Sequence, residues 1–389
     1  MYYTIVGRDT TAGRRHSLLL LNCPNHMQSL RDFTFRNIMS TPACRISYRS
    51  GFKLNLKLLC THFLQLNCIT SLLSETSYGG LLLYCHIPVS DTFNRNGTHM
   101  SIKRKLTTIY KPQGQPGFLG RGHTARPVIQ RAYADSDPFI LLMDDVLDKQ
   151  DDEPVGGPHP HAGFETVSLL LEGQMGDGEH KMMAGDFQMM TAGSGVIHTE
   201  TIDTTTRMRL LQLWLNLPKH LRWTTPRVQD LRADHVPSSS QDGVDIRVYS
   251  GTLAGLTSPI QNHTPVIIAD ITIQAHTHTE LDIPASYHTF MYVLEGRVTV
   301  GEDEKMISKG QVGWLDTFLD ETRSILQLST GEEATRFVLY AGQPQGDPIV
   351  SHGPFIGDTQ DDIRRLYQEF RHGKMKHIST VPEHQRMLL

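Results

Sequence analysis

Short apolar runs, each closed by a turn rich in glycine or aspartate, recur along the chain after Met100. The runs are rich in β-branched and aliphatic residues and are too short for helices. This rhythm predicts an all-β fold, a sandwich or barrel, rather than alternating strands and helices. The expected strands are Thr166–Leu171, Phe187–Thr191, Met208–Leu217, Val244–Ser250, Val266–Ile273, Phe290–Leu294, Arg297–Val300 and Arg336–Ala341.

One segment near the end of the sequence has helical periodicity instead. After Thr359, apolar residues at positions 363, 366, 367 and 370 fall on a single stripe. Thr359 and Asp362 resemble a capping box, and Gly373 is a suitable stop. We therefore expect a C-terminal helix that packs its apolar stripe against a barrel.

Two segments of the β-region recur at a nearly constant offset. Val167–Gly173 recurs as Phe290–Gly296, 123 residues later, and Ala184–Phe187 recurs as Lys309–Val312, 125 residues later. In each copy a strand ends in Leu-Glu-Gly, a hairpin returns, and a Gly-polar-apolar step opens the next strand. The repeat predicts two similar antiparallel β-barrels of jelly-roll type, which we place at residues 100–225 and 226–389.

The first 99 residues differ from the rest in composition. They contain all five cysteines and carry ten Lys and Arg against four Asp and Glu, whereas the remainder carries 27 against 37. No apolar run there approaches the ~20 residues that span a bilayer, and no export signal is legible. We expect residues 1–99 to be a non-native or disordered extension, with a mitochondrial transit segment as the alternative. A cytoplasmic location without membrane contact is the default expectation.

Several classes of function are disfavoured for residues 100–389. The net charge of −10 argues against direct nucleic-acid binding, and Lys103-Arg104-Lys105 is expected to be a solvated basic cluster. A cysteine nucleophile is excluded because no cysteine follows Met100. Ser194 lies in Gly193-Ser194-Gly195, which lacks the five-residue Gly-x-Ser-x-Gly pattern of a serine hydrolase.

Histidines and acidic residues at alternate positions predict a metal site in the first copy. His159 and His161 are two apart, so in a strand they face one side with Cα atoms about 6.7 Å apart. His198 and Glu200 form a second such pair, 37 residues after His161. Two strands that each supply two ligands would bind one ion with three imidazoles and a carboxylate. Glu165 shares the parity of His159 and His161, so spacing alone leaves Glu165 and Glu200 as alternative carboxylate ligands.

The second copy lacks this pattern. The offset places Asp282, Pro284 and Arg323 where His159, His161 and His198 stand in the first copy. A separate pair, His276 and His278, lies six residues too early and is expected to consist of loop polar groups. The metal site is therefore expected only in the first barrel.

The residues that carry this chemistry resemble the pirin family of the cupin superfamily. The resemblance covers roughly Thr107 to the end of the C-terminal helix. The matching segments are His159–Thr166, Gly185-Asp186, Met190–Glu200 and His352–Phe355.

This resemblance implies a bicupin, two stacked barrels with metal only in the N-terminal one. It assigns the ligands to His159, His161, His198 and Glu200, and it matches Glu165 to a family glutamate that is not a ligand. The ion is usually iron, and several members cleave the flavonol quercetin with dioxygen. Other members are described as regulators that act through protein partners. The family commonly has Trp where this chain has Met189, so an aromatic wall near the site is expected to be lost or moved. The Gly173–Gly185 hairpin also looks several residues shorter than usual, and both departures bear on the substrate more than on metal binding.

Together these observations predict a metal-dependent dioxygenase of the quercetin 2,3-dioxygenase type. The donors suit Fe(II) and are compatible with zinc, nickel, copper or manganese. The expected partners are a flavonoid-like aromatic substrate and O2, with Glu200 accepting the substrate proton. The alternative is a non-enzymatic, redox-sensitive iron protein that acts through a protein partner. Sequence alone names neither the physiological substrate, the cellular metal nor the oligomeric state.

Overall fold

The computed structural model describes residues 44–47, 53–56, 73–75, 81–83, 102–176, 181–319 and 322–389. The chain divides into two compact units, Met1–His99 and Met100–Leu389. In the first unit, β1 (Cys44–Ser47) pairs with β2 (Lys53–Leu56), and β3 (Leu73–Glu75) pairs with β4 (Leu81–Leu83). The rest of residues 1–99 lies outside the described part, so their role as an extension stays a prediction.

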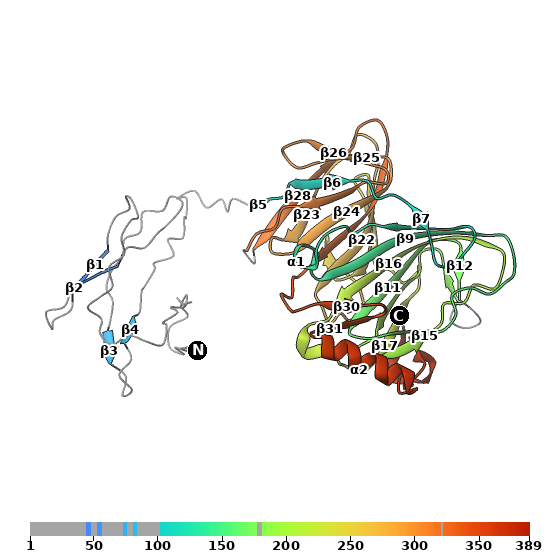
Figure 1. Ribbon diagram of the computed structural model, residues 1–389. Helices are drawn as coiled ribbons and strands as arrows, with labels where there is room; N and C mark the ends of the chain where they lie inside the picture. Colours follow the sequence, from blue (N-terminus) through green and yellow to red (C-terminus); the bar gives the residue numbers. More distant parts are fainter. Residues whose placement is uncertain are drawn as a thin grey trace. The chain divides into compact units, whose positions relative to one another are not determined.

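The second unit contains two large sheets (Figure 1). The strands of the first are β7 (Gln115–Pro116), β8 (His123–Pro127), β9 (Phe139–Lys149), β11 (Phe164–Glu172), β14 (Phe187–Thr191), β16 (Thr206–Asn216), β17 (Arg227–Leu231) and β32 (Arg386–Leu388). Their order is β32-β17-β14-β11-β16-β9-β8-β7. The strands of the second are β6 (Leu106–Tyr110), β18 (Ser238–Gln241), β19 (Val244–Ser250), β22 (Val266–Ile273), β24 (His288–Glu295), β27 (Val312–Leu315) and β29 (Thr335–Gly342). Their order is β18-β19-β22-β29-β24-β27-β6.

Smaller sheets complete each barrel. The second barrel is closed by β23 (His278–Pro284), β28 (Arg323–Ser329), β25 (Arg297–Val300) and β26 (Lys305–Ser308), with β5 (Ile102–Lys103) beside β28. The two-stranded sheets are β10 (His159–His161) with β15 (Val196–His198), β12 (Gln174–Met175) with β13 (Met182–Met183), β20 (Thr252–Leu253) with β21 (Leu256–Thr257), and β30 (Val350–His352) with β31 (Phe355–Gly357). Among the described residues, the helices are α1 (Tyr133–Ser136), α2 (Gln360–Arg371) and three 3-10 turns at Lys219–Leu221, Ile378–Thr380 and Glu383–Gln385. The predicted all-β bicupin with a C-terminal helix is confirmed.

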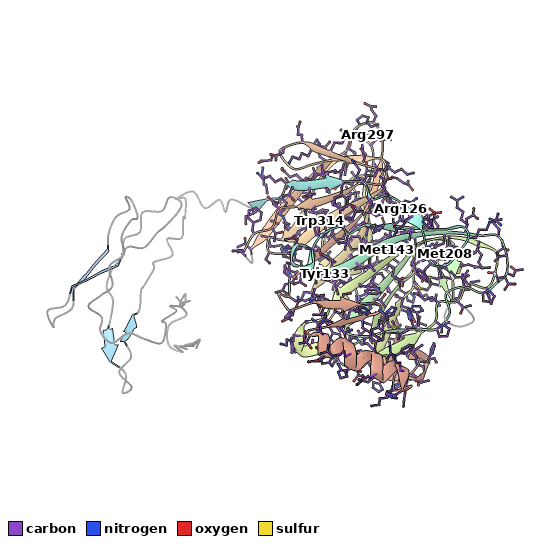
Figure 2. The ribbon with its side chains drawn as sticks, in the orientation of Figure 1. Arg126, Tyr133, Met143, Met208, Arg297 and Trp314 are labelled. Atoms are coloured by element: carbon purple, nitrogen blue, oxygen red, sulfur yellow. The ribbon has the colours of Figure 1, made fainter. Side chains whose placement is uncertain are left out.

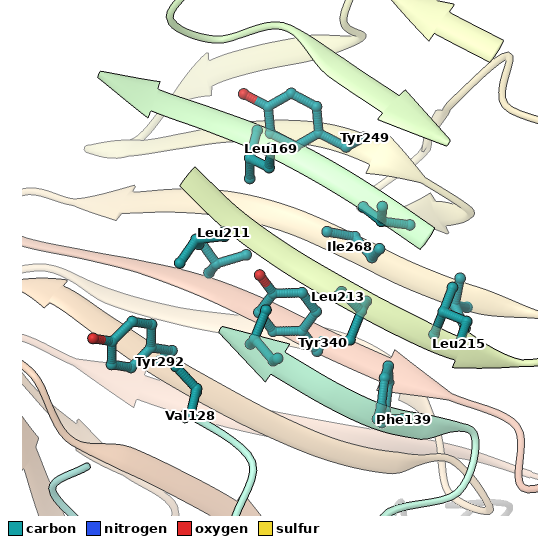
Figure 3. Packing of buried hydrophobic residues seen from close by; sticks show 14 of the residues in the cluster. Val128, Phe139, Leu169, Leu211, Leu213, Leu215, Tyr249, Ile268, Tyr292 and Tyr340 are labelled. Carbon is teal, nitrogen blue, oxygen red and sulfur yellow. The ribbon is translucent and has the colours of Figure 1, made fainter. Parts of the chain in front are cut away.

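The largest apolar core lies where the two large sheets face each other (Figure 3). Leu169 of β11 and Leu211 of β16 pack in the same cluster as Tyr340 of β29. The opposite faces of the same strands fill the barrel interiors, with Leu170 and Leu210 inside the first barrel. Strands buried on both faces need apolar residues at nearly every position, which explains the continuous apolar runs in the sequence.

All eight strands expected from the sequence correspond to observed strands. Four match residue for residue: Phe187–Thr191, Val244–Ser250, Val266–Ile273 and Arg297–Val300. The C-terminal helix is also confirmed, since α2 begins after Thr359 and has a reciprocal capping box with Asp362. Its apolar stripe packs beside Phe355 of β31 rather than directly on a large sheet.

The internal repeat extends to individual hydrogen bonds. The Gly185 amide donates to the Leu170 carbonyl at 2.7 Å, and the Gly310 amide donates to the Val293 carbonyl at 2.8 Å. The register of β11 against β16 shifts between Leu170 and Glu172, and that of β24 against β29 shifts at the equivalent point, 123 residues later. The two barrels therefore share a bulge and a turn, as expected of a duplicated unit.

Each large sheet contains strands from both sides of the boundary that we placed at residue 225. Strand β6, near the start of the unit, pairs with β27 of the second sheet. Conversely, β17 pairs with β14 of the first sheet, and β32 at the end of the chain pairs with β17. The division at residue 225 stays a prediction for folding units and does not coincide with the sheets.

The expectation that Lys103-Arg104-Lys105 is a solvated cluster is wrong for its central residue. Arg104 is 1% exposed, and its guanidinium donates to the Asp316 carboxylate and to the carbonyls of Pro284 and Tyr287. A buried guanidinium is tolerated only when its donors are paired in this way. Arg104, between β5 and β6, therefore links this part of the chain to the second barrel.

Candidate metal centre

The two motif strands are hydrogen-bonded neighbours. Strand β10 pairs antiparallel with β15, and His159 lies directly opposite His198 in the register. The ring centroids of these two histidines are 4.3 Å apart, and each lies 4.9 Å from the ring of His161. One donor atom from each of the three lies within 4.8 Å of the other two. The alternate spacing in the sequence thus brings three imidazoles to one point.

The hydrogen bonds of His159 direct its Nε2 toward the point where the three imidazoles meet. Its Nδ1 lies 2.9 Å from the Gly157 carbonyl, which can only accept, so Nδ1 carries the proton. Nε2 of His159 therefore presents a lone pair, and it lies 2.8 Å from Nε2 of His198. A backbone carbonyl that fixes one ring nitrogen while the other faces an ion is the usual support of a histidine ligand.

Burial keeps the other two imidazoles neutral. Loss of hydration, followed by repulsion from His198 and His159, holds the pKa of His161 well below its usual value. Burial, reinforced by His159 and His377, lowers the pKa of His198 to about 3. Neutral imidazole is the form that binds a metal ion, so the three histidines fit a divalent transition metal.

Glu200 lies beside this triad, after the end of β15. Its Oε2 is 3.9 Å from Nε2 of His159, and its Oε1 accepts a hydrogen bond from the Gln212 side chain at 3.3 Å. Burial raises the pKa of Glu200, while His159 and Gln212 act in the opposite direction. One carboxylate oxygen is therefore oriented by Gln212, and the other faces the histidines.

Glu165, the alternative carboxylate, belongs to another environment. Its Oε1 accepts from the Thr191 hydroxyl at 2.7 Å and lies 4.0 Å from the Arg227 guanidinium. The parity argument that linked it to His159 fails because Gly163, at φ +88°, breaks the strand between β10 and β11. From there Glu165 points to the same side as Val167 and Leu169, toward the core between the sheets. The geometry favours Glu200 over Glu165 as the carboxylate of the site.

Comparison with known proteins agrees with this arrangement. Residues 122–215 match the Pirin domain, and residues 268–376 match the Pirin C-terminal cupin domain. Pirin-like protein 2 of Arabidopsis thaliana is 34% identical, over 77% of this chain and 94% of its own length. The chain belongs to the pirin family. Pirin of Homo sapiens is also 34% identical, over 71% of this chain and 95% of its own length.

The chain also shares its fold with an enzyme of known structure. The chain is similar to quercetin 2,3-dioxygenase from Acinetobacter baumannii, with 28% identity, a TM-score of 0.62, and coverage of 71% of this chain and 99% of the other. Together, the family, this neighbour and the histidine triad identify a cupin-type metal-dependent protein.

The C-terminal segments 352–357 and 376–377 of this pirin-family chain contact the two strands that carry the ligand motifs, and we call these segments the C-terminal brace. The sequence analysis did not predict these contacts. The Ile356 amide donates to the Ala162 carbonyl at 2.9 Å, directly after His161. On the other strand, the Ile197 amide donates to the Lys376 carbonyl at 2.9 Å, and the Thr199 hydroxyl lies 3.0 Å from Nε2 of His377. The His352–Phe355 motif belongs to this brace. Its proximity to the site could not be derived from spacing, because roughly 180 to 190 residues separate the contacting segments.

The second barrel holds no comparable cluster among its described residues. Asp282 and Arg323 form an exposed ion pair at 3.7 Å instead. His276 and His278 are also exposed, and His276 lies 3.4 Å from Glu332. His276 is therefore an exposed loop residue, as expected, whereas His278 is exposed but begins strand β23, so the expectation of a loop is wrong for His278.

Met189, where the family commonly has Trp, does not lie beside the triad. Met189 is fully buried in the core between the large sheets. The aromatic wall of the triad is formed by Trp214, whose ring lies 5.4 Å from His161 and stacks on Phe164 at 4.2 Å. Residues 177–180 of the Gly173–Gly185 hairpin lie outside the described part, so its length stays an untested expectation.

Glu165 supports a prediction about stability. Burial raises its pKa to about 7 from 4.5, so between these values the folded chain holds a proton that the unfolded chain releases. Stability contributed by this group is present below pH 4.5 and is lost as the pH rises through 7. We expect Glu165→Gln to raise the free energy of unfolding at pH 8 by up to about 3 kcal/mol and to have little effect at pH 4.5. Urea denaturation at both pH values measures this, and a variant that is less stable at pH 8 would contradict it.

Proposed function

We propose that this chain is an iron-dependent dioxygenase that opens the ring of a flavonol-type substrate such as quercetin. The observation that carries the proposal is the convergence of His159, His161 and His198 beside Glu200. Two of these residues, His159 and Glu200, also line a hollow. The name of the Acinetobacter baumannii neighbour supports the choice of substrate class.

The residues that would hold the ion are the three histidines and Glu200. Four protein ligands would leave room on a six-coordinate ion for substrate and dioxygen. When bound, iron would supply Lewis-acid and redox chemistry. Iron is proposed over zinc because zinc has no redox chemistry and would supply the Lewis acid alone.

The chain's own groups would orient the substrate and move its proton. Apolar side chains line the hollow and favour an aromatic body, among them Met175, Met208 and Leu210; Figure 2 labels Met208. Glu200 would accept the proton of the flavonol 3-hydroxyl. Gln212 would hold the accepting carboxylate in place through its bond to Oε1.

The test is oxygen consumption by the full chain, loaded anaerobically with Fe(II) and then mixed with quercetin and air-saturated buffer. We expect oxygen uptake to equal quercetin loss, and His159→Ala to reduce the rate by about 1000-fold or more. His276→Ala, an exposed histidine in the second barrel, serves as the matched control and should retain the full rate. A chain that holds one iron but consumes no oxygen would refute the dioxygenase and favour the regulatory alternative.

A further inference from the structure

A hairpin at the rim of the hollow exposes an aromatic side chain. Strands β7 and β8 enclose the turn 117–122, and Phe118 in this turn is 81% exposed. Phe118 and Leu119 line the same hollow as His159 and Glu200. Exposure of a whole phenyl ring is unfavourable in water, so its position beside a candidate metal centre suggests an apolar ligand as its partner.

A buried histidine holds this hairpin in place. Nδ1 of His123 accepts a hydrogen bond from the Leu119 amide at 3.1 Å, so the ring proton sits on Nε2. Nε2 then donates to the Asp145 carboxylate at 2.9 Å. Because both ring nitrogens are occupied, His123 has no free atom for substrate, and its role is to position the hairpin.

The turn is fitted closely to this imidazole. A Cβ on Gly117 would lie 2.0 Å from Nδ1 of His123, so only glycine allows the backbone to lie against the ring. The Phe118 ring meets the edge of the same imidazole, with 5.6 Å between centroids and 80° between planes. His123 therefore fixes both the backbone of the turn and the direction of its aromatic side chain.

The hollow beside the candidate metal centre measures about 380 Å³ when its open mouth is included. Phe118 lines this hollow and is 81% exposed, so it lies at the solvent side of the hollow. A planar substrate that extends from the histidines toward solvent would therefore pass Phe118.

We propose that Phe118 is a specificity-determining residue that covers an aromatic substrate at the metal centre, and that the His123–Asp145 pair is the positioning element that aims it. This inference rests on the proposed function. The ligand class is a planar aromatic molecule with a metal-directed hydroxyl at one end. Offset or edge-to-face contact with the Phe118 ring would hold its distal end.

The experiment measures quercetin binding rather than turnover. The full chain, loaded with Fe(II) under strictly anaerobic conditions, is titrated with quercetin, and the shift of the flavonol absorption band gives Kd. We expect Phe118→Ala to raise Kd about tenfold with unchanged iron content. His123→Phe keeps an aromatic ring but removes both hydrogen bonds, and it should raise Kd by a similar factor. Asp145→Asn retains an acceptor for Nε2 and should stay within about twofold of the parent.

The double variant Phe118→Ala/His123→Phe distinguishes positioning from a general structural role. If His123 acts through Phe118, the double variant should bind no more weakly than either single variant, because both remove the same contact. Met306→Ala, a half-exposed apolar residue on β26 of the other barrel, is the matched control.

Each outcome tests a different part of the proposal. An unchanged Kd for Phe118→Ala overturns the covering role while leaving the proposed function intact. Additive effects in the double variant overturn the positioning role of His123. A parent chain that holds iron but binds no quercetin overturns the flavonol proposal and this inference with it. Since Phe118 is exposed, its removal cannot unfold the barrel, so the test stands even if His123→Phe fails to fold.

Discussion

Replacing His198 by alanine is expected to reduce bound metal from one equivalent per chain to a small fraction of that value. His198 is buried, directly opposite His159 in the register of β10 and β15. Removing one of three convergent imidazoles leaves too few donors, and affinity should fall by roughly 100-fold or more, since even indirect supports of such ligands contribute 10–100-fold. Elemental analysis of protein purified without chelator measures the loss.

The matched control for this variant is His278→Ala. His278 is an exposed histidine on the second barrel, so its removal should leave the metal content unchanged. Equal metal content in His198→Ala and the parent would mean that the ion binds elsewhere, and the site described above would then be wrong.

Replacing Gly163 by alanine is expected to destabilise the unit by about 3 kcal/mol or more and to release the metal. Gly163 joins β10 to β11 at φ +88°, and a Cβ there would lie 1.9 Å from the Ile356 carbonyl oxygen. Relief of that clash would push the C-terminal brace away from Ala162 and disturb His161, two residues before the glycine. Urea denaturation and metal analysis of the same sample measure both effects.

Two other glycines separate the effect of the Cβ clash from that of the left-handed backbone. Gly157→Ala adds a Cβ into open space without a left-handed backbone, so no loss of stability is expected. Gly120 shares the φ of +88° but also faces open space, so Gly120→Ala should cost only the backbone strain of about 1 kcal/mol. A Gly163→Ala variant as stable as Gly120→Ala would show that Ile356 moves aside freely and that the brace does not depend on this contact.

The local sequence pattern was sufficient to predict the strands, the C-terminal helix and the convergence of the three histidines. Continuous apolar runs identified strands such as Val266–Ile273 because these are buried on both faces. The repeat revealed the duplication because the same bulge and turn occur in both barrels. The pairs at positions 159/161 and 198/200 predicted a converging site because strand alternation is a rigid geometric rule.

The features that were missed depend on contacts between distant segments. Parity placed Glu165 with His159, but the left-handed turn at Gly163 transfers the chain to another sheet and ends the alternation. The exchange of β6 and β17 between sheets has no local signal, and neither has the burial of Arg104. The His123–Asp145 pair likewise joins strands that are adjacent only in the folded sheet.

The most direct test of the metal centre is a titration of the metal-free full chain with Co(II), followed by its visible ligand-field absorption. The account predicts saturation at one equivalent, bands that change in Glu200→Gln but not in Glu165→Gln, and loss of the signal in His159→Ala. A signal that survives in His159→Ala, or one that is altered by Glu165→Gln and not by Glu200→Gln, would contradict the ligand set of His159, His161, His198 and Glu200.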